Sequence, residues 1–144
     1  MHFDPSPPWR ACLAALLLGL AGAVRATDLT VEVRNVKSSE GRELVALFNA
    51  AEGFPRTGYW RGEDVAAAPP TVRVVFRGIP EGSYAVTAFQ DLDNNRKLKT
   101  NGLGIPIEPL AFSNDPATMD GPPKFSDASF KVSGQAMNVV LKLK

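Results

Sequence analysis

Cysteine and histidine are almost missing from this 144-residue sequence, which has only Cys12 and His2. Both precede the region 27–144 that we predict to be the mature protein, so that region contains neither residue type. Disulfides, Cys/His zinc sites and Ser-His-Asp or thiol catalysis are therefore excluded from it. The fold must be stabilised by its hydrophobic core.

Residues 1–26 are predicted to be a signal peptide. The apolar run 11–24 has the length of a secretory h-region, and Val24 and Ala26 are small residues suited to cleavage after Ala26. The alternative, a buried helix or an uncleaved anchor, fits less well, because the run is short for a membrane span and a strand pattern follows it. We expect one domain over 27–144, in the periplasm or outside the cell.

The mature region has no excess of charge of either sign. Removing Arg10, Arg25 and Asp4 leaves 14 basic and 14 acidic residues. Such a balance offers no electrostatic footprint for nucleic acid or for an anionic membrane. We therefore expect no nucleic-acid partner and no stable membrane insertion after signal cleavage.

Alternation of apolar and polar residues is the dominant pattern and predicts strands. It occurs in the runs 29–36, 43–49, 71–78, 83–91, 128–133 and 137–144, and a seventh strand is expected within 108–112. In the first run Leu29, Val31 and Val33 share one face, and in the second Leu44, Ala46 and Phe48 repeat this theme. The sequence thus predicts an all-β protein, an antiparallel β-sandwich of about seven strands, prealbumin-like or immunoglobulin-like.

Three short connections containing turn residues predict hairpins. They are 38–41, 79–82 and the turn around Gly134. The run 83–91 is apolar on nearly both faces, which is typical of a strand in the centre of a sheet.

Two segments depart from the strand pattern. Residues 49–70 are predicted to be a long surface connection with at most one helical turn, whose aromatics Phe54, Tyr59 and Trp60 cap an open end of the sandwich. Residues 91–127 are rich in proline and glycine but also apolar, and we expect them to pack on the sandwich as an ordered lid. The apolar residues concerned are Leu103, Ile105, Ile107, Leu110, Phe112 and Phe125.

Several motifs together resemble one family. The strings "AEGFP", "GIPEGSYAVTAFQDLDNN", "TNGLGIPIEPLAFSN" and "GPPKFSDASF" occur in this order and cover essentially all of the mature region. They resemble the bacterial secreted family DUF2141, a domain of unknown function. The resemblance implies a prealbumin-like or transthyretin-like β-sandwich in the bacterial envelope, without an established activity.

The loop "DLDNNRKLKTN" has oxygen-bearing side chains at alternate positions, namely Asp91, Asp93 and Asn95, as a calcium loop does. A calcium loop of this type needs a glycine at its sixth position and a bidentate carboxylate at its twelfth, but these are Arg96 and Gly102. Two acidic residues also face three basic ones, Arg96, Lys97 and Lys99. The prediction is a turn stabilised by side-chain-to-backbone hydrogen bonds, with no metal and no other cofactor.

The family pattern in this loop is His-Asp-x-Asn-x-Asn-Gly-x-x-Asp-x-Asn. Relative to it, Gln90 stands at the histidine, Arg96 at the glycine and Lys99 at the second-half aspartate. These three departures fall at the positions that matter most for a metal site. The resemblance therefore does not carry a metal site over to this loop.

Function is predicted only in outline. We expect a non-catalytic module that binds an envelope protein, a glycan or a small molecule through the 91–127 lid and the 54–60 loop. The candidate contact residues are Tyr59, Trp60, Asp91, Asp93, Asn95, Asn101, Glu108 and Asn114. The alternatives are a weak hydrolase or isomerase using Asp91, Asp93 or Glu108, and a structural accessory domain. Convergence of those three carboxylates in a concave pocket would favour an enzyme, whereas an exposed surface of Tyr59, Trp60 and prolines would favour a binder.

Overall fold

The structure, a computed structural model, describes Gly22 and residues 25–144. The predicted signal peptide lies almost entirely outside these described residues. Within the described part of the chain, no helix is long and apolar enough to cross a membrane.

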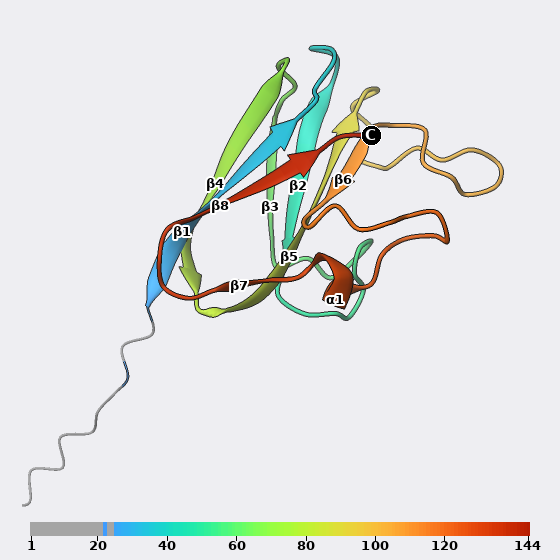
Figure 1. Ribbon diagram of the computed structural model, residues 1–144. Helices are drawn as coiled ribbons and strands as arrows, with labels where there is room; N and C mark the ends of the chain where they lie inside the picture. The colour runs from blue at the N-terminus through green and yellow to red at the C-terminus, as the bar shows by residue number, and fades with distance from the viewer. Residues whose placement is uncertain (1–21, 23–24) are drawn as a thin grey trace, which may run out of the picture.

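The described chain forms eight strands and one short helix, arranged in two sheets (Figure 1). In chain order these are β1 (Ala26–Arg34), β2 (Arg42–Phe48), β3 (Arg61–Ala66), β4 (Thr71–Pro80), β5 (Gly82–Asp91), β6 (Leu110–Phe112), α1 (Phe125–Ala128), β7 (Phe130–Val132) and β8 (Met137–Lys142). The predicted all-β class and sandwich architecture are confirmed.

One sheet has the order β4-β1-β8 and the other β3-β2-β5-β6. All neighbours are antiparallel except β1 and β8, which run parallel. The two short strands β6 and β7 both pair with β5, which β2 also pairs with. The predicted central position of β5 is therefore confirmed.

The core lies between the two sheets and is built from the alternating apolar faces of the long strands. Leu29, Val31 and Val33 of β1 are fully buried, as their alternation predicts. Val86 and Ala88 of β5 face them from the other sheet within the same cluster. Burial of each of the larger apolar side chains stabilises the fold by about 1.5–3 kcal/mol. This hydrophobic core is the source of stability in a mature region without cysteine.

The inward face of β2 is the opposite of the predicted one. Val45 and Leu47 belong to the core cluster, whereas Leu44 and Ala46 are only partly buried. Because side chains alternate with a period of two, this shift of one residue also turns Glu43 inward.

None of the three predicted hairpins forms, because each short connection crosses from one sheet to the other. Residues 35–41 join β1 to β2, Glu81 joins β4 to β5, and residues 133–136 join β7 to β8. In each pair one strand belongs to the sheet β4-β1-β8 and the other to the sheet that contains β5. Tight connections between the layers close the ends of the sandwich. Two pairs of consecutive strands do lie side by side: β2 and β3, joined by 49–60, and β5 and β6, joined by 92–109.

Two elements were not predicted. β3 lies in the segment interpreted as a surface connection, and it has no fully buried residue. Helix α1 is a single turn close to the start of β7. The predicted seventh strand is confirmed as β6.

Candidate functional site

The candidate residues lie at opposite ends of β2 and do not form one site. At one end Phe48 pairs with Ala85, and the backbone N–H of Trp60 donates to the carbonyl oxygen of Leu47. At the other end Arg42 pairs with Asp91. A strand of this length spans about 20 Å, so the aromatic and acidic candidates occupy separate surfaces.

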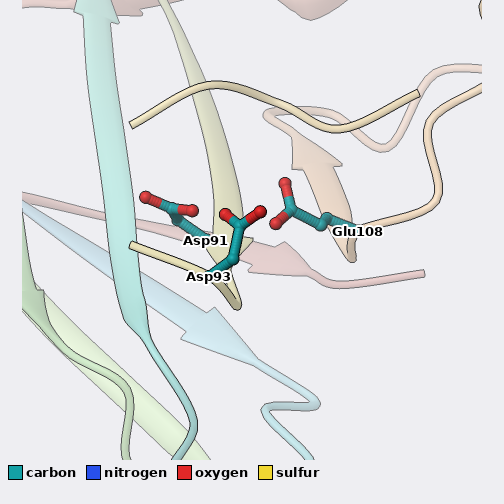
Figure 2. Close-up of side chains that lie close together, drawn as sticks. All are labelled: Asp91, Asp93 and Glu108. Carbon is teal, nitrogen blue, oxygen red and sulfur yellow. The ribbon is translucent and has the colours of Figure 1, made fainter. Parts of the chain in front are cut away.

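An acidic cluster forms at the Asp91 end. Asp91 is the last residue of β5, Asp93 follows in the loop, and Glu108 precedes β6. One carboxylate oxygen from each lies within 4.8 Å of those from the other two, and Asp93 lies between its two neighbours (Figure 2). Asp91 and Glu108 are buried, whereas Asp93 is exposed.

Asp91 builds the turn that follows β5. Its two carboxylate oxygens accept hydrogen bonds from the backbone N–H groups of Asn95 at 3.2 Å and Arg96 at 2.7 Å. Gly41 makes this close packing feasible, because a Cβ at residue 41 would lie 1.8 Å from the carbonyl oxygen of Asp91. The predicted side-chain-to-backbone turn is therefore confirmed.

Arg96 adopts the left-handed turn conformation, with φ of 60°, for which the sequence would favour glycine. Arginine therefore adopts here the conformation that glycine provides at the sixth position of a calcium loop. Its guanidinium contacts Oδ2 of Asp64 in β3 at 2.7 Å, so its charge is paired with an acid outside the cluster. This ion pair fastens the loop to the edge of the sheet.

Glu108 closes the same loop from its other end. Its carboxylate accepts hydrogen bonds from the backbone N–H groups of Leu92 at 3.1 Å and Lys99 at 2.9 Å. Asp93 accepts weaker bonds from Asn95, at 3.4 Å from the backbone nitrogen and 3.3 Å from the side-chain amide. Gly102, at the twelfth position of the loop, has no carboxylate, and Glu108 places one beside Asp91 and Asp93 instead. The spacing of residues within the loop could not reveal this contact.

Asn101 forms a second turn within the same segment. Its side-chain oxygen accepts from the backbone N–H groups of Leu103 at 2.9 Å and Ile105 at 3.0 Å. Thr100 and Pro106 form an antiparallel bridge around it. This small hairpin projects away from the sandwich (Figure 1), so the expected packing of Leu103, Ile105 and Ile107 on the sheets is wrong.

All six oxygens of the acidic cluster accept hydrogen bonds from the loop. Three carboxylates are the ligands that a hard cation prefers, but here the backbone N–H groups already offset their mutual repulsion. The same hydrogen bonds leave Asp91 and Glu108 poorly placed to exchange protons with a substrate. The carboxylates converge, as an enzyme would require, yet the groove described below lies at the other end of β2.

We predict that calcium binds with a Kd of about 10⁻³ M or weaker, because the oxygens of the three acids already accept hydrogen bonds and Lys97 and Lys99 add positive charge to the loop. The double variant Arg96→Gly, Lys99→Asp should reach submillimolar affinity, since it relaxes the left-handed turn and makes the loop acidic. Lys99→Asp alone changes the charge of the loop and leaves Arg96 in the turn, so it separates the effect of charge from that of the turn. Calorimetry decides: submillimolar binding by the parent, or no gain in the double variant, would contradict this interpretation.

The aromatic residues of the 49–60 connection cap the other end of the sandwich, as predicted. Phe54 packs edge-on against Phe48 and Phe125, with ring centroids 5.0 and 5.8 Å away. The ring centroids of Trp60 and Tyr84 lie 5.9 Å apart. The Arg61 guanidinium carbon lies over the Trp60 ring, 5.3 Å from its centroid. Tyr59 and Trp60 are exposed.

A groove of about 580 Å³ lies at this end, between the 49–60 connection and the segment that leads into α1. Phe54, Pro55 and Phe125 form its apolar lining together with Pro122 and Pro123. Ala51, Lys124 and Ser126 complete it. Sequence reasoning named both segments and the aromatic Phe54, but it did not place these lining residues together, since only packing does so.

Asn114 has a structural role next to this end. It adopts a left-handed conformation, with φ of 63°, and its amide donates to the carbonyl oxygens of Ser129 at 2.7 Å and Asp127 at 3.4 Å. The hydroxyl of the neighbouring Ser113 donates to the Ala128 carbonyl oxygen at 2.6 Å. These bonds fix α1 against the sheet, so Asn114 positions the groove wall and does not line the groove.

Glu43 is an ionisable residue that sequence reasoning missed. Its side chain is 0% exposed, and neither carboxylate oxygen has a hydrogen-bond partner among the described residues. Gln90 lies opposite on β5, but its amide donates to the Ser38 and Glu40 carbonyl oxygens instead. Burial raises the pKa of Glu43 from 4.5 to about 7. The sequence signal that could have identified it is its position directly before the apolar run 44–48.

Comparison with known proteins supports the resemblance drawn from the motifs. The family model DUF2141, described as uncharacterized protein conserved in bacteria, matches residues 31–140. Neither the curated proteins nor the solved structures gave a match. Because the match runs from the middle of β1 into β8 and includes every element between them, this chain belongs to the DUF2141 family.

Proposed function

We propose that this protein is a non-catalytic binding module of the bacterial envelope, exported by its N-terminal segment and holding an apolar ligand in the groove beside Phe54 and Phe125. The groove carries the proposal, because it lies between the two segments, 54–60 and 91–127, that the sequence singles out. Its size fits a small molecule or a short apolar segment of a partner protein.

The chemistry of the groove defines the class of ligand. Aromatic rings and prolines offer rigid apolar surface that loses little conformational entropy on binding. Lys124 places one positive charge at the lining, with its backbone N–H already donating to Asp127 at 3.2 Å. An apolar body with one anionic group is the ligand that this arrangement favours.

The balanced charge of the mature region and the absence of histidine and cysteine from it support a binding role over nucleic-acid recognition or nucleophilic catalysis. The carboxylate cluster supports it too, because its oxygens are engaged in building the loop.

We predict that the apolar anion anilinonaphthalenesulfonate binds the folded protein in this groove. Ala51→Glu should weaken binding about tenfold, because an exposed wall residue becomes bulky and negative. Fluorescence titration measures the affinity, and amide NMR shifts at residues 51–54 and 124–126 locate the dye. Ala136→Glu, at an exposed position outside the groove lining, is the matched control.

Equal binding by the parent and Ala51→Glu, or shifts confined to other residues, would contradict the proposed site. Thermal unfolding of each variant verifies that the dye reports a folded protein and not exposed core.

A further inference from the structure

The hairpin at 97–107 is ordered by hydrogen bonds although it lies outside the sandwich. The backbone N–H of Asn101 donates to the Ile105 carbonyl oxygen, and that of Ile107 to the Lys99 carbonyl oxygen, each at 2.9 Å. Glu108 and Asp91 hold the two ends of the longer loop against β5 and β6. The hairpin is therefore a defined projection.

Three aliphatic side chains of this projection face solvent. Leu103 is 85% exposed, Ile105 55% and Ile107 54%. Because these side chains are exposed, they contribute nothing to the hydrophobic core. Holding the hairpin in one conformation nevertheless costs conformational entropy. An ordered convex apolar tip of this kind marks a contact surface.

The charged side chains around the tip are mostly basic. Lys97 and Lys99 are exposed, as are Arg96 and the single acid Asp93. Asp91 and Glu108 are buried under the loop, where backbone N–H groups bind them. The mature region has equal numbers of acids and bases, but in this loop two of the three acids are buried and the bases face outward.

We propose that this hairpin inserts shallowly into the surface of an anionic phospholipid bilayer. Leu103, Ile105 and Ile107 would enter the boundary between headgroups and acyl chains, while Lys97 and Lys99 contact the lipid phosphates. An apolar tip flanked by lysines matches the apolar acyl layer and the anionic headgroups of such a bilayer. The contact is reversible, goes beyond the proposed groove function, and involves no spanning segment.

Vesicle co-sedimentation tests the contact with the exported protein, whose N-terminus is verified by intact mass. The parent should bind vesicles of phosphatidylcholine mixed with phosphatidylglycerol. The triple variant Leu103→Ser, Ile105→Ser, Ile107→Ser should bind at least about tenfold more weakly, since each side chain no longer transfers its apolar surface. Retained binding by the folded triple variant, or no binding by the parent, would overturn the proposal.

The lysines provide a second arm of the test. Lys97→Gln, Lys99→Gln should weaken binding to the anionic vesicles by about tenfold and leave binding to pure phosphatidylcholine unchanged. Equal loss on both kinds of vesicle would contradict the attraction of these lysines to anionic headgroups.

A fluorescent label locates the inserted segment, because residues 27–144 contain no cysteine. A nitrobenzoxadiazole dye on Leu103→Cys should brighten and shift to the blue with vesicles. The same dye on Met119→Cys, which is 96% exposed in the separate 113–124 segment, should not respond. Response of the Met119 label alone would refute insertion through the hairpin.

The groove and the hairpin are distinguishable in these experiments. Ala51→Glu should leave vesicle binding unchanged, and the triple serine variant should leave dye binding unchanged. Sedimentation velocity detects self-association: a dimer lost in the triple variant, without vesicle binding, would overturn the membrane contact and identify a second copy as the partner.

Discussion

Replacing Tyr84 with alanine is expected to lower the free energy of unfolding by about 3 to 5 kcal/mol. Tyr84 is 4% exposed and lies in the central strand β5, within the core cluster. Its ring packs on Trp60, and its hydroxyl donates to the Pro80 carbonyl oxygen at 2.7 Å. Truncation would leave a cavity where β5 is paired with β7.

Denaturant unfolding measures this loss, and two variants calibrate it. Tyr84→Phe keeps the ring and should lose only the hydrogen bond, about 1 kcal/mol. Tyr59→Ala removes an exposed tyrosine from the same end of the sandwich and should cost much less. A loss below about 1 kcal/mol for Tyr84→Ala would show that this side chain is not part of the core.

The second large effect is a loss of stability with rising pH that originates at Glu43. The pKa of this carboxyl is raised to about 7 in the folded protein from 4.5, because burial disfavours its charged form. Between these two values the unfolded chain releases the proton and the folded protein retains it. Stability therefore falls as pH rises through this window, by roughly 3 kcal/mol in total, and the loss is complete above about pH 7.

The variant Glu43→Gln removes this titration while preserving the shape of the side chain. Its stability relative to the parent should rise by roughly 3 kcal/mol between about pH 4 and about pH 8. Other groups cancel in this difference, including Glu32, whose pKa is lowered by its hydrogen bond from Arg34. Glu63→Gln, at an exposed position of β3, is the matched control and should show no such trend.

Urea unfolding at several pH values gives these free energies. A difference between parent and Glu43→Gln that stays constant from pH 4 to 8 would contradict the burial of an unpaired carboxyl at this position.

The strands of this protein could be predicted from its sequence because a period of two in apolar residues reports a half-buried surface directly. Leu29, Val31 and Val33 of β1 alternate with polar residues and are buried as expected. β5 is apolar on nearly both faces, and it pairs with β2 on one side and with β6 and β7 on the other. The turn at Asp91 was also predictable, since an aspartate binds backbone N–H groups only a few residues away.

The tertiary structure decided which strands pair, which face of a strand is buried and which distant residues come together. Alternation shows that a strand has an inner face but not which strand lies beside it, so the three short connections predicted as hairpins instead cross between sheets. β3 exists because β2 offers it an edge, not because its own residues alternate. Glu43 faces inward because Val45 and Leu47 outweigh one carboxyl in burial free energy. Glu108 reaches Asp91 only because β6 pairs with β5, a contact between residues distant in sequence that no local pattern records.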